Sequence, residues 1–487
     1  MNDIDTVQPP RRQGEKPAPR RRSWADQPAS ISLIMALALP TLVEQVLSAV
    51  IGFTDTVVAG HTGADGPDRA AAAAAVGAMT YLQWFAGLMT STLGVGATAI
   101  VARSIGAGKP RIANRVAGTA CVAAFGVGIL VALIFYFGAP VFAWAFRFDG
   151  RTAEYAVQYL QIMSWTVCFQ TAGQIGMACL RGAGDTKRPM VVTAIITVVN
   201  GIFSWALTFG KLGLPAWGVR GNATGTLFAF MVAGIVTFGF LLYGDGGLQL
   251  RMRHLKIVPH LLQRISRIGI PSFLEGMLLW GGQLVVVMLV MGAVDKAVGH
   301  AGSGVTMAAH NASLRIESLA FLPGYGFGIA CSALVGQYLG AKKPLEAQRA
   351  TVLCNRLAVL TMTLAAIPMV FIPRPMIGLL VDSEEVVKMG WIPLVLAGLA
   401  QPAFALAIIK SCALKGAGDT ISPMYTTLIG MGSRVVAVIL IMMVLTKMGR
   451  ADLGLICVWV CIFLDLGFRG VAMEMVFRRG KWKEQAV

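Results

Sequence analysis

The stretch Arg181-Gly-Ala-Gly-Asp-Thr-Lys-Arg-Pro-Met190 returns later in the chain as Lys415-Gly-Ala-Gly-Asp-Thr-Ile-Ser-Pro-Met424. A second motif, Val101-Ala-Arg-Ser-Ile-Gly-Ala-Gly-Lys-Pro110, returns as Val335-Gly-Gln-Tyr-Leu-Gly-Ala-Lys-Lys-Pro344 at the same spacing along the chain. Two motifs that repeat at one spacing are hard to obtain by chance. The chain therefore consists of two related halves, and the rest of the sequence has to be interpreted in that frame.

The composition indicates an integral membrane protein. Of the 487 residues, 56% are hydrophobic and only 13% are charged, whereas soluble domains carry about 25% charged residues. The net charge of +17 could point to nucleic acid. We exclude nucleic acid as a partner because the basic residues form short clusters between long apolar runs, which is typical of charges that set membrane topology.

Twelve apolar runs are long enough to cross a bilayer, which takes about 20 residues in a helix. The expected spans are residues 31–58, 70–100, 113–143, 155–179, 190–210, 217–243, 266–294, 304–336, 351–373, 386–413, 424–447 and 453–477. If both termini are cytoplasmic, most of the 41 Lys and Arg residues fall in the tails and inner loops, as the positive-inside rule requires. We expect a multi-pass protein of the cell inner (plasma) membrane without a cleavable signal peptide.

The two halves open alike, with Pro40-Thr-Leu-Val-Glu44 in the first and Pro271-Ser-Phe-Leu-Glu275 in the second. Each half holds six spans, so both have the same orientation and are related by an axis along the membrane normal. This arrangement suits alternating access around a central site. The expected divisions are a disordered basic cytoplasmic tail (1–30), an N-lobe (31–243), a cytoplasmic linker (244–265), a C-lobe (266–477) and a cytoplasmic tail (478–487).

Most of the local motifs have a structural interpretation. In each GAGDT motif the aspartate, Asp185 or Asp419, is expected to cap the following helix. The run Gly106-Ala-Gly-Lys-Pro110 resembles part of a phosphate loop, but Pro110 stands where that motif needs Ser or Thr. Without an ATP-binding domain, transport would have to be driven by an ion gradient. The eight cysteines lie in or beside apolar runs, and we expect no disulfide and no zinc-type metal site.

Ionisable residues inside the spans are the functional candidates, because charges at membrane depth are costly. Asp465 and Arg469 are one helical turn apart and are expected to neutralise each other. Arg315 and Glu317 are two positions apart, so they point to different sides and need partners on other helices. The remaining in-span carboxylates are Glu44, Asp55 and Glu275.

Asp55 differs from the other in-span acids. It lies near the outer end of the first span, no basic residue lies within a helical turn of it, and its counterpart in the second half is Val286. A carboxylate in that position could take up a proton on one side of the membrane and release it on the other. A purely structural hydrogen-bonding role is the alternative.

Taken together, the motifs resemble those of the multidrug and toxic compound extrusion (MATE) family, in its DinF-like bacterial branch. The resemblance covers nearly the whole chain from about Ile31 to Lys483. It rests on these stretches: Pro40…Glu44-Gln45…Asp55-Thr…Gly60-His61-Thr-Gly63, both GAGDT repeats, Ala309-His-Asn…Leu314-Arg-Ile-Glu-Ser318, Val335-Gly-Gln…Lys343 and Arg478-Arg-Gly-Lys-Trp482. It implies an all-α membrane fold of twelve transmembrane helices in two pseudo-symmetric six-helix lobes around a central V-shaped cavity.

The resemblance also implies a cation-coupling cluster in the N-lobe. In proton-coupled members an Asp on helix 1 joins an Asn and, four residues later, an Asp on helix 5, together with a Thr on helix 6. Asp55 and Asn200 match this pattern, Thr226 corresponds to the Thr, and Ser204 replaces the second Asp. That replacement leaves Asp55 as the main titrating candidate, with Glu44 as a substitute. The NorM-like acid that follows a Gln on helix 10 is missing after Gln401, so no C-lobe sodium site of that kind is expected.

The resulting hypothesis is a monomeric secondary antiporter that exchanges protons or sodium ions for small cationic amphipathic molecules and uses no cofactor. Its partners are the small-molecule substrate and the lipid bilayer. The candidate substrate-cavity residues are Gln45, Glu275, Gln283, Arg315 and Glu317. One alternative is a flippase for a lipid-linked or polar-lipid substrate of the same superfamily. A second alternative is a membrane-embedded enzyme, which a buried His/Asp constellation around His310 would favour.

Overall fold

The structure is a computed structural model, and it describes residues 24–62, 66–244, 248–297, 299 and 304–485. Within them the chain forms long helices and no strand. The α-helices are α1 (Ile31–Gly60), α2 (Gly66–Gly106), α3 (Pro110–Ala145), α4 (Gly150–Gly182), α5 (Lys187–Phe209), α6 (Val219–Leu242), α7 (Pro259–Ala297), α8 (Val305–Gly340), α9 (Pro344–Phe371), the short α10 (Pro373–Gly378), α11 (Glu384–Ala417), α12 (Ile421–Lys447) and α13 (Gly454–Arg478). The 3₁₀ helices are η1 (Trp24–Asp26), η2 (Met252–His254), η3 (Ala451–Leu453) and η4 (Lys481–Glu484).

The predicted fold of twelve long helices is confirmed. By length and composition, 11 of the described helices could cross a membrane. The exception is α4, which carries polar side chains such as Gln161 and Gln170 along its length. Because α4 packs against α2, α3 and α6, it lies largely inside its lobe and does not need an apolar surface all round.

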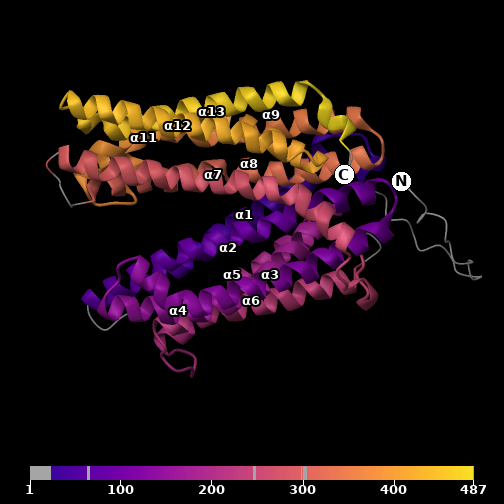
Figure 1. Ribbon diagram of the computed structural model, residues 1–487, viewed down its shortest axis with the longest axis horizontal. Coiled ribbons are helices and arrows are strands. Elements are labelled where there is room, and N and C mark those ends of the chain that lie inside the picture. Colours follow the sequence, from indigo (N-terminus) through magenta and orange to yellow (C-terminus); the bar gives the residue numbers. More distant parts are fainter. Residues whose placement is uncertain (1–23, 63–65, 245–247, 298, 300–303, 486–487) are drawn as a thin grey trace, which may run out of the picture.

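The helices form two bundles that lie together at one end of the molecule and diverge toward the other (Figure 1). Helices α1 to α6 make the N-lobe, and α7 to α13 make the C-lobe. The described ends of the chain both lie near the joined end (Figure 1), as an even number of spans requires. The lobes touch through α2 with α7 and α8, and through α1 with α8.

At the joined end, the first turns of one helix from each lobe pack into the hydrophobic core of the other lobe. Leu33 and Ile34 of α1 are buried in a cluster with Phe327 of α8. In the same way, Ile265 of α7 is buried in a cluster with Val101 of α2. This exchange interlocks the two lobes at the end that carries the termini.

The lobe boundaries expected from hydropathy need two adjustments. Helix α7 begins at Pro259 rather than at 266, because its first turns are amphipathic and pack on the N-lobe. Within the tail expected to be disordered, 24–30 is ordered against the C-lobe, while 1–23 lies outside the described residues. The backbone N–H of Ala29 donates to Glu346 Oε2 at 2.8 Å, and the Tyr338 hydroxyl donates to the carbonyl of Gln27 at 3.0 Å.

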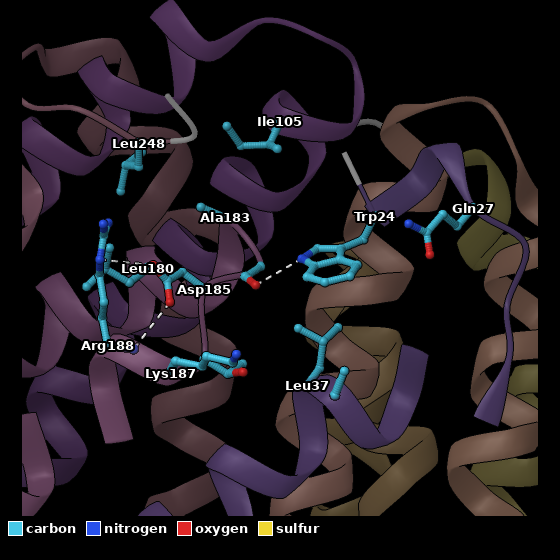
Figure 2. A pocket seen from close by; sticks show the side chains of 13 residues that line it. Trp24, Gln27, Leu37, Ile105, Leu180, Ala183, Asp185, Lys187, Arg188 and Leu248 are labelled. Atoms are coloured by element: carbon cyan, nitrogen blue, oxygen red, sulfur yellow. Dashed lines mark hydrogen bonds and ion pairs between the residues drawn. The ribbon is translucent and has the colours of Figure 1, made fainter. Parts of the chain in front are cut away.

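The ordered segment also reaches across to the N-lobe. The indole Nε1 of Trp24 donates to the carbonyl of Gly184 at 2.9 Å, and Figure 2 shows the ring directed at the GAGDT turn. Beside it, Gln337 Nε2 of α8 donates to the carbonyl of Gly182 at 3.0 Å. Two carbonyls of one N-lobe turn are therefore held by donors anchored on the C-lobe.

The GAGDT turns have the structure expected for them. Gly184 and Gly418 adopt positive φ angles of 87° and 92°, which glycine reaches without steric cost. The Asp185 carboxylate accepts from the backbone N–H of Arg188 at 3.2 Å, and Asp419 accepts from that of Ser422 at 3.1 Å. The predicted capping role of both aspartates is confirmed.

Candidate cation site and substrate cavity

Two cavities of about 460 and 470 Å³ lie among the long apolar helices, mainly one in each lobe, and Gln45 of α1 lines both. The N-lobe cavity is lined mainly by residues of α1, α2, α4, α5 and α6, among them Glu44, Asp55, Tyr159, Arg181, Thr226 and Phe230, with Ile329 of α8 on the side of the C-lobe. The C-lobe cavity is lined mainly by residues of α7, α8, α11 and α13, among them Glu275, Trp280, Phe321, Tyr325, Phe404, Lys415 and Arg469.

Asp55 lines the N-lobe cavity and is half-buried. Its Oδ1 accepts from Asn200 Nδ2 at 3.1 Å and from the Thr226 hydroxyl at 3.3 Å. Asn200 Nδ2 also lies 2.9 Å from Thr226 Oγ1. The structure thus brings together three candidates from α1, α5 and α6 that are far apart in the sequence.

Ser204 and Asn222 complete the cluster. Ser204 Oγ accepts from Asn200 Nδ2 at 3.3 Å and donates to the carbonyl of Asn222 at 3.3 Å. Asn222 Nδ2 donates to the backbone carbonyl of Asp55 at 3.3 Å. The sequence analysis missed Asn222. Its place one helical turn before Thr226, on a helix whose neighbours are mostly apolar, is the signal that could have found it.

Glycine sets the distance between α5 and α6 at this point. A Cβ on Gly225 would collide with the backbone of Ser204. The two helices therefore approach closely enough for short polar side chains to reach across. The cluster depends on this close approach, because Ser204 is too short to bridge a normal helix–helix spacing.

No described residue forms an ion pair with Asp55, and its side-chain partners are neutral. Two buried amide oxygens of the cluster, Asn200 Oδ1 and Asn222 Oδ1, have no hydrogen-bond partner among the described residues. A carboxylate, a hydroxyl and two free amide oxygens form a set of hard oxygen donors. Such a set can hold a small cation or surround a protonated carboxyl.

The other two acids at the cavities have basic partners. Glu44 lies apart from the Asp55 cluster, and its Oε1 accepts from Arg181 Nη1 at 2.5 Å. In the second half, Glu275 Oε2 lies 2.9 Å from Lys415 Nζ. The sequence analysis missed both bases because the apolar runs end before them. The helices continue to Gly182 and Ala417, which places the basic side chains opposite the acids.

A buried polar network lies deeper in the C-lobe. Arg469 Nη2 bonds to Asp465 Oδ2 at 2.6 Å, which confirms the predicted pair, and Arg434 Nη1 approaches the same oxygen at 3.5 Å. Arg434 Nη2 also donates to Gln283 Oε1 at 2.8 Å. Gln283 is thus bound in this network, and the residues that line the two cavities do not include it.

The remaining candidates are separated by the fold. Glu317 is buried and Arg315 is exposed, so the two do point to different sides, and neither lines the two cavities. His310 Nε2 lies 3.0 Å from Gln283 Nε2, and its ring packs edge-on against Trp459. The carboxylate partner that an enzymatic constellation around His310 would need is not among these contacts.

Comparison with known proteins identifies a family. The MatE family model matches residues 40–206 and 271–440, which are the corresponding parts of the two halves. A similar protein is the probable multidrug resistance protein NorM of Thermotoga maritima, 28% identical over 456 residues that make up 93% of each chain.

Solved structures share the fold. A transporter of the MOP superfamily from Pyrococcus furiosus superposes with a TM-score of 0.81 at 19% identity, covering 95% of this chain and 98% of that one. A multidrug resistance MATE family transporter in an outward-facing conformation gives 0.83 at 18% identity over 96% and 100%. A variant of the Vibrio cholerae MATE transporter VcmN gives 0.80 at 17% identity over 95% and 100%.

Proposed function

The chain belongs to the MatE family, and on that premise we propose that it is a secondary active exporter that exchanges protons or sodium ions for small cationic amphipathic molecules. As a member of this family it is a multi-pass membrane transporter and not an enzyme. The coupling ion, the substrate class and the direction of transport are the parts that we propose.

The observation that carries the coupling is the environment of Asp55. It is a carboxylate on a cavity wall that is held only by neutral side chains, Asn200 and Thr226. The other cavity acids, Glu44 and Glu275, already have a basic partner. Asp55 is therefore the cavity acid with a free charge to neutralise, and a proton or a sodium ion would do so.

A rocking movement of the two lobes would expose the Asp55 site to one side of the membrane and then to the other. The first turns of α1 pack on the C-lobe at the joined end, and Asp55 stands near the other end of this helix (Ile31–Gly60), so its part of the cavity wall lies toward the divergent end. If the lobes rock so that the divergent end closes and the joined end opens, Asp55 gives up its cation to the opposite side. When one proton or sodium ion enters for each singly charged substrate that leaves, no net charge crosses the membrane, so the concentration gradient of the ion drives the exchange. Each tenfold difference in ion concentration supplies about 1.4 kcal/mol.

The cavity linings favour cationic amphiphiles. Four aromatic rings line the C-lobe cavity, those of Trp280, Phe321, Tyr325 and Phe404. Aromatic faces attract both apolar surface and positive charge. The Thermotoga maritima relative is named as a probable multidrug resistance protein, which supports export of drug-like small molecules. We place the protein in the inner (plasma) membrane as a monomer, with both termini in the cytoplasm.

The cavity cations argue against a flippase for lipid-linked anions. Arg181 is bound to Glu44, Lys415 to Glu275, and Arg469 to Asp465. Each basic residue lining these two cavities is thus bound to a carboxylate within the described part of the chain. A pyrophosphate-bearing substrate would need cations that are free to bind it.

The test uses the purified protein in liposomes with a fluorescent cationic dye. We expect dye movement when a pH gradient or a sodium gradient is imposed, and each is applied alone to identify the ion. Asp55→Asn should abolish the gradient-driven part. The control Asp382→Asn changes an exposed acid in the loop before α11 and should transport normally. Gradient-driven transport that persists in Asp55→Asn would overturn the coupling assignment, and dye movement under neither gradient would overturn the antiporter.

A further inference from the structure

The two lobes contain the same charge pair, built from the same two motifs. In each lobe the acid stands four residues after a helix proline, as Glu44 after Pro40 and Glu275 after Pro271. The base directly precedes GAGDT, as Arg181 and Lys415. The pairs close at 2.5 Å for Glu44–Arg181 and at 2.9 Å for Glu275–Lys415. The two halves thus share an ion pair between two helices as well as the GAGDT turn.

Both pairs lie on cavity walls, and in each pair the acid is more deeply buried than the base. The side chains of Glu44 and Glu275 are 6% and 8% exposed, whereas those of Arg181 and Lys415 are 14% and 23% exposed. One oxygen of Glu44, Oε2, has no hydrogen-bond partner among the described residues. The carboxylate can therefore accept a hydrogen bond from another donor, and the more exposed base lies between it and the cavity.

The pairs do not depend on how the lobes are tilted. Glu44 and Arg181 lie on α1 and α4 of the N-lobe, and Glu275 and Lys415 lie on α7 and α11 of the C-lobe. Contacts inside a lobe survive when the lobes rock. What can separate them is a competing charge, because Arg and Lys have long, flexible stems that can swing a charged head away from its partner.

When a substrate cation replaces the basic side chain beside Glu44 or Glu275, the carboxylate still has one positive partner. An unpaired carboxylate at membrane depth is costly, and so is an ion pair that has lost one member. Exchange of one cation for another avoids the unpaired carboxylate, and the displaced base, which is more exposed than the acid, can turn its charged head toward the cavity on its flexible stem. Since Gln45 lines both cavities, a single amphiphile between the lobes lies within reach of either carboxylate.

We propose that Arg181 and Lys415 are resident cations, which occupy Glu44 and Glu275 in the empty transporter and are displaced when a cationic amphiphile binds there. The proposal rests on the proposed function, because it names where the positive charge of the substrate is held. It predicts that removal of a resident cation tightens the binding of cations, whereas a purely structural ion pair would not distinguish the charge of the ligand.

The test measures equilibrium binding with two probes of one shape and opposite charge, tetraphenylphosphonium and tetraphenylborate. The full chain is purified in detergent, and binding is followed by a scintillation proximity assay without any gradient. In Arg181→Met we expect the Kd for the phosphonium to fall about tenfold or more, because a full charge is at stake at contact distance, while the borate binds no better. Glu44→Gln should weaken the phosphonium and strengthen the borate. Arg181→Lys should restore wild-type values for both.

Lys415→Met repeats the test in the other lobe, should Arg181→Met not yield folded protein. Monodisperse elution and thermal unfolding verify the fold of every variant. Equal changes for both probes, or no change for the phosphonium in Arg181→Met and Lys415→Met, would overturn the proposal. Because these measurements need no gradient, such a result leaves the coupling role of Asp55 standing. Conversely, failure of the liposome test leaves the binding result intact.

Discussion

Gly106 at the end of α2 packs against the backbone carbonyl of Gln337 in α8, and Gly340 packs in the same way against the carbonyl of Arg103. These four residues are equivalent in pairs, because Arg103 and Gly106 occupy the positions of Gln337 and Gly340 in the repeated motif. The motif therefore meets its own copy at the joined end of the lobes. A Cβ at either glycine would overlap the opposite backbone.

A methyl group at this contact should force the joined end apart. We expect Gly106→Ala and Gly340→Ala each to cost about 1 to 3 kcal/mol in the state described here, as overpacking does. The population should shift toward molecules open at the joined end. Spin labels at Arg111 and Leu345, which are exposed at equivalent positions on α3 and α9, would report a longer distance by pulsed electron resonance.

The control for these variants is Gly126→Ala in α3, where a Cβ meets nothing within 4 Å. It should leave the distance distribution unchanged. The two partly exposed cysteines, Cys412 and Cys457, are replaced by serine in all samples so that only the introduced sites are labelled. An unchanged distribution in Gly106→Ala would show that the lobes do not separate at this contact.

Trp24 makes a second contact that links the two lobes at their joined end. Trp24→Phe keeps an aromatic ring but removes the hydrogen bond to the carbonyl of Gly184, which is worth about 1 kcal/mol. The same pair of labels should show a several-fold larger open population. Trp144→Phe, at a ring that is 79% exposed, serves as the matched control. A distribution identical to wild type in Trp24→Phe would mean that the segment does not restrain the lobes.

Asp465 should be the most sensitive acid for stability. Asp465→Asn leaves Arg434 and Arg469 facing each other without the carboxylate that binds both. Removal of one member of a buried ion pair costs about 3 to 5 kcal/mol, so we expect a marked fall in Tm. The exposed pair of Asp452 with Arg450 should be worth less than about 1 kcal/mol. If Asp452→Asn and Asp465→Asn lower Tm equally, the network is not structural.

The linker between the lobes should make stability depend on pH. Burial, together with Arg253, Arg251 and Arg115, lowers the pKa of His254 below its ordinary value of 6.5. The folded protein therefore favours the neutral ring, whose Nδ1 accepts from the backbone N–H of Arg251 at 3.2 Å. This stabilisation is present above pH 6.5 and is lost as the pH falls through the lowered pKa. Tm should fall over that range, and less so in His254→Gln. An equal slope in both proteins would exclude His254 as the cause.

The sequence by itself determined the architecture. The repeated motifs defined two halves, and apolar length predicted helices whose observed bounds lie within seven residues of the expected ones. The same patterns pointed to Asp55, Asn200 and Thr226. These inferences succeed because span length, loop charge and turn chemistry are local properties, which the bilayer imposes on each segment separately.

Only the tertiary structure decided which charges neutralise each other. The sequence offered Glu44 and Glu275 as candidates without partners, and the fold gave them Arg181 and Lys415. It also added Asn222 to the Asp55 cluster and exchanged the first turns of α1 and α7 between the lobes. Such pairings depend on how far a helix continues past its last apolar residue and on where neighbouring helices cross. Hydropathy records neither, because both follow from packing between segments that are far apart in the chain.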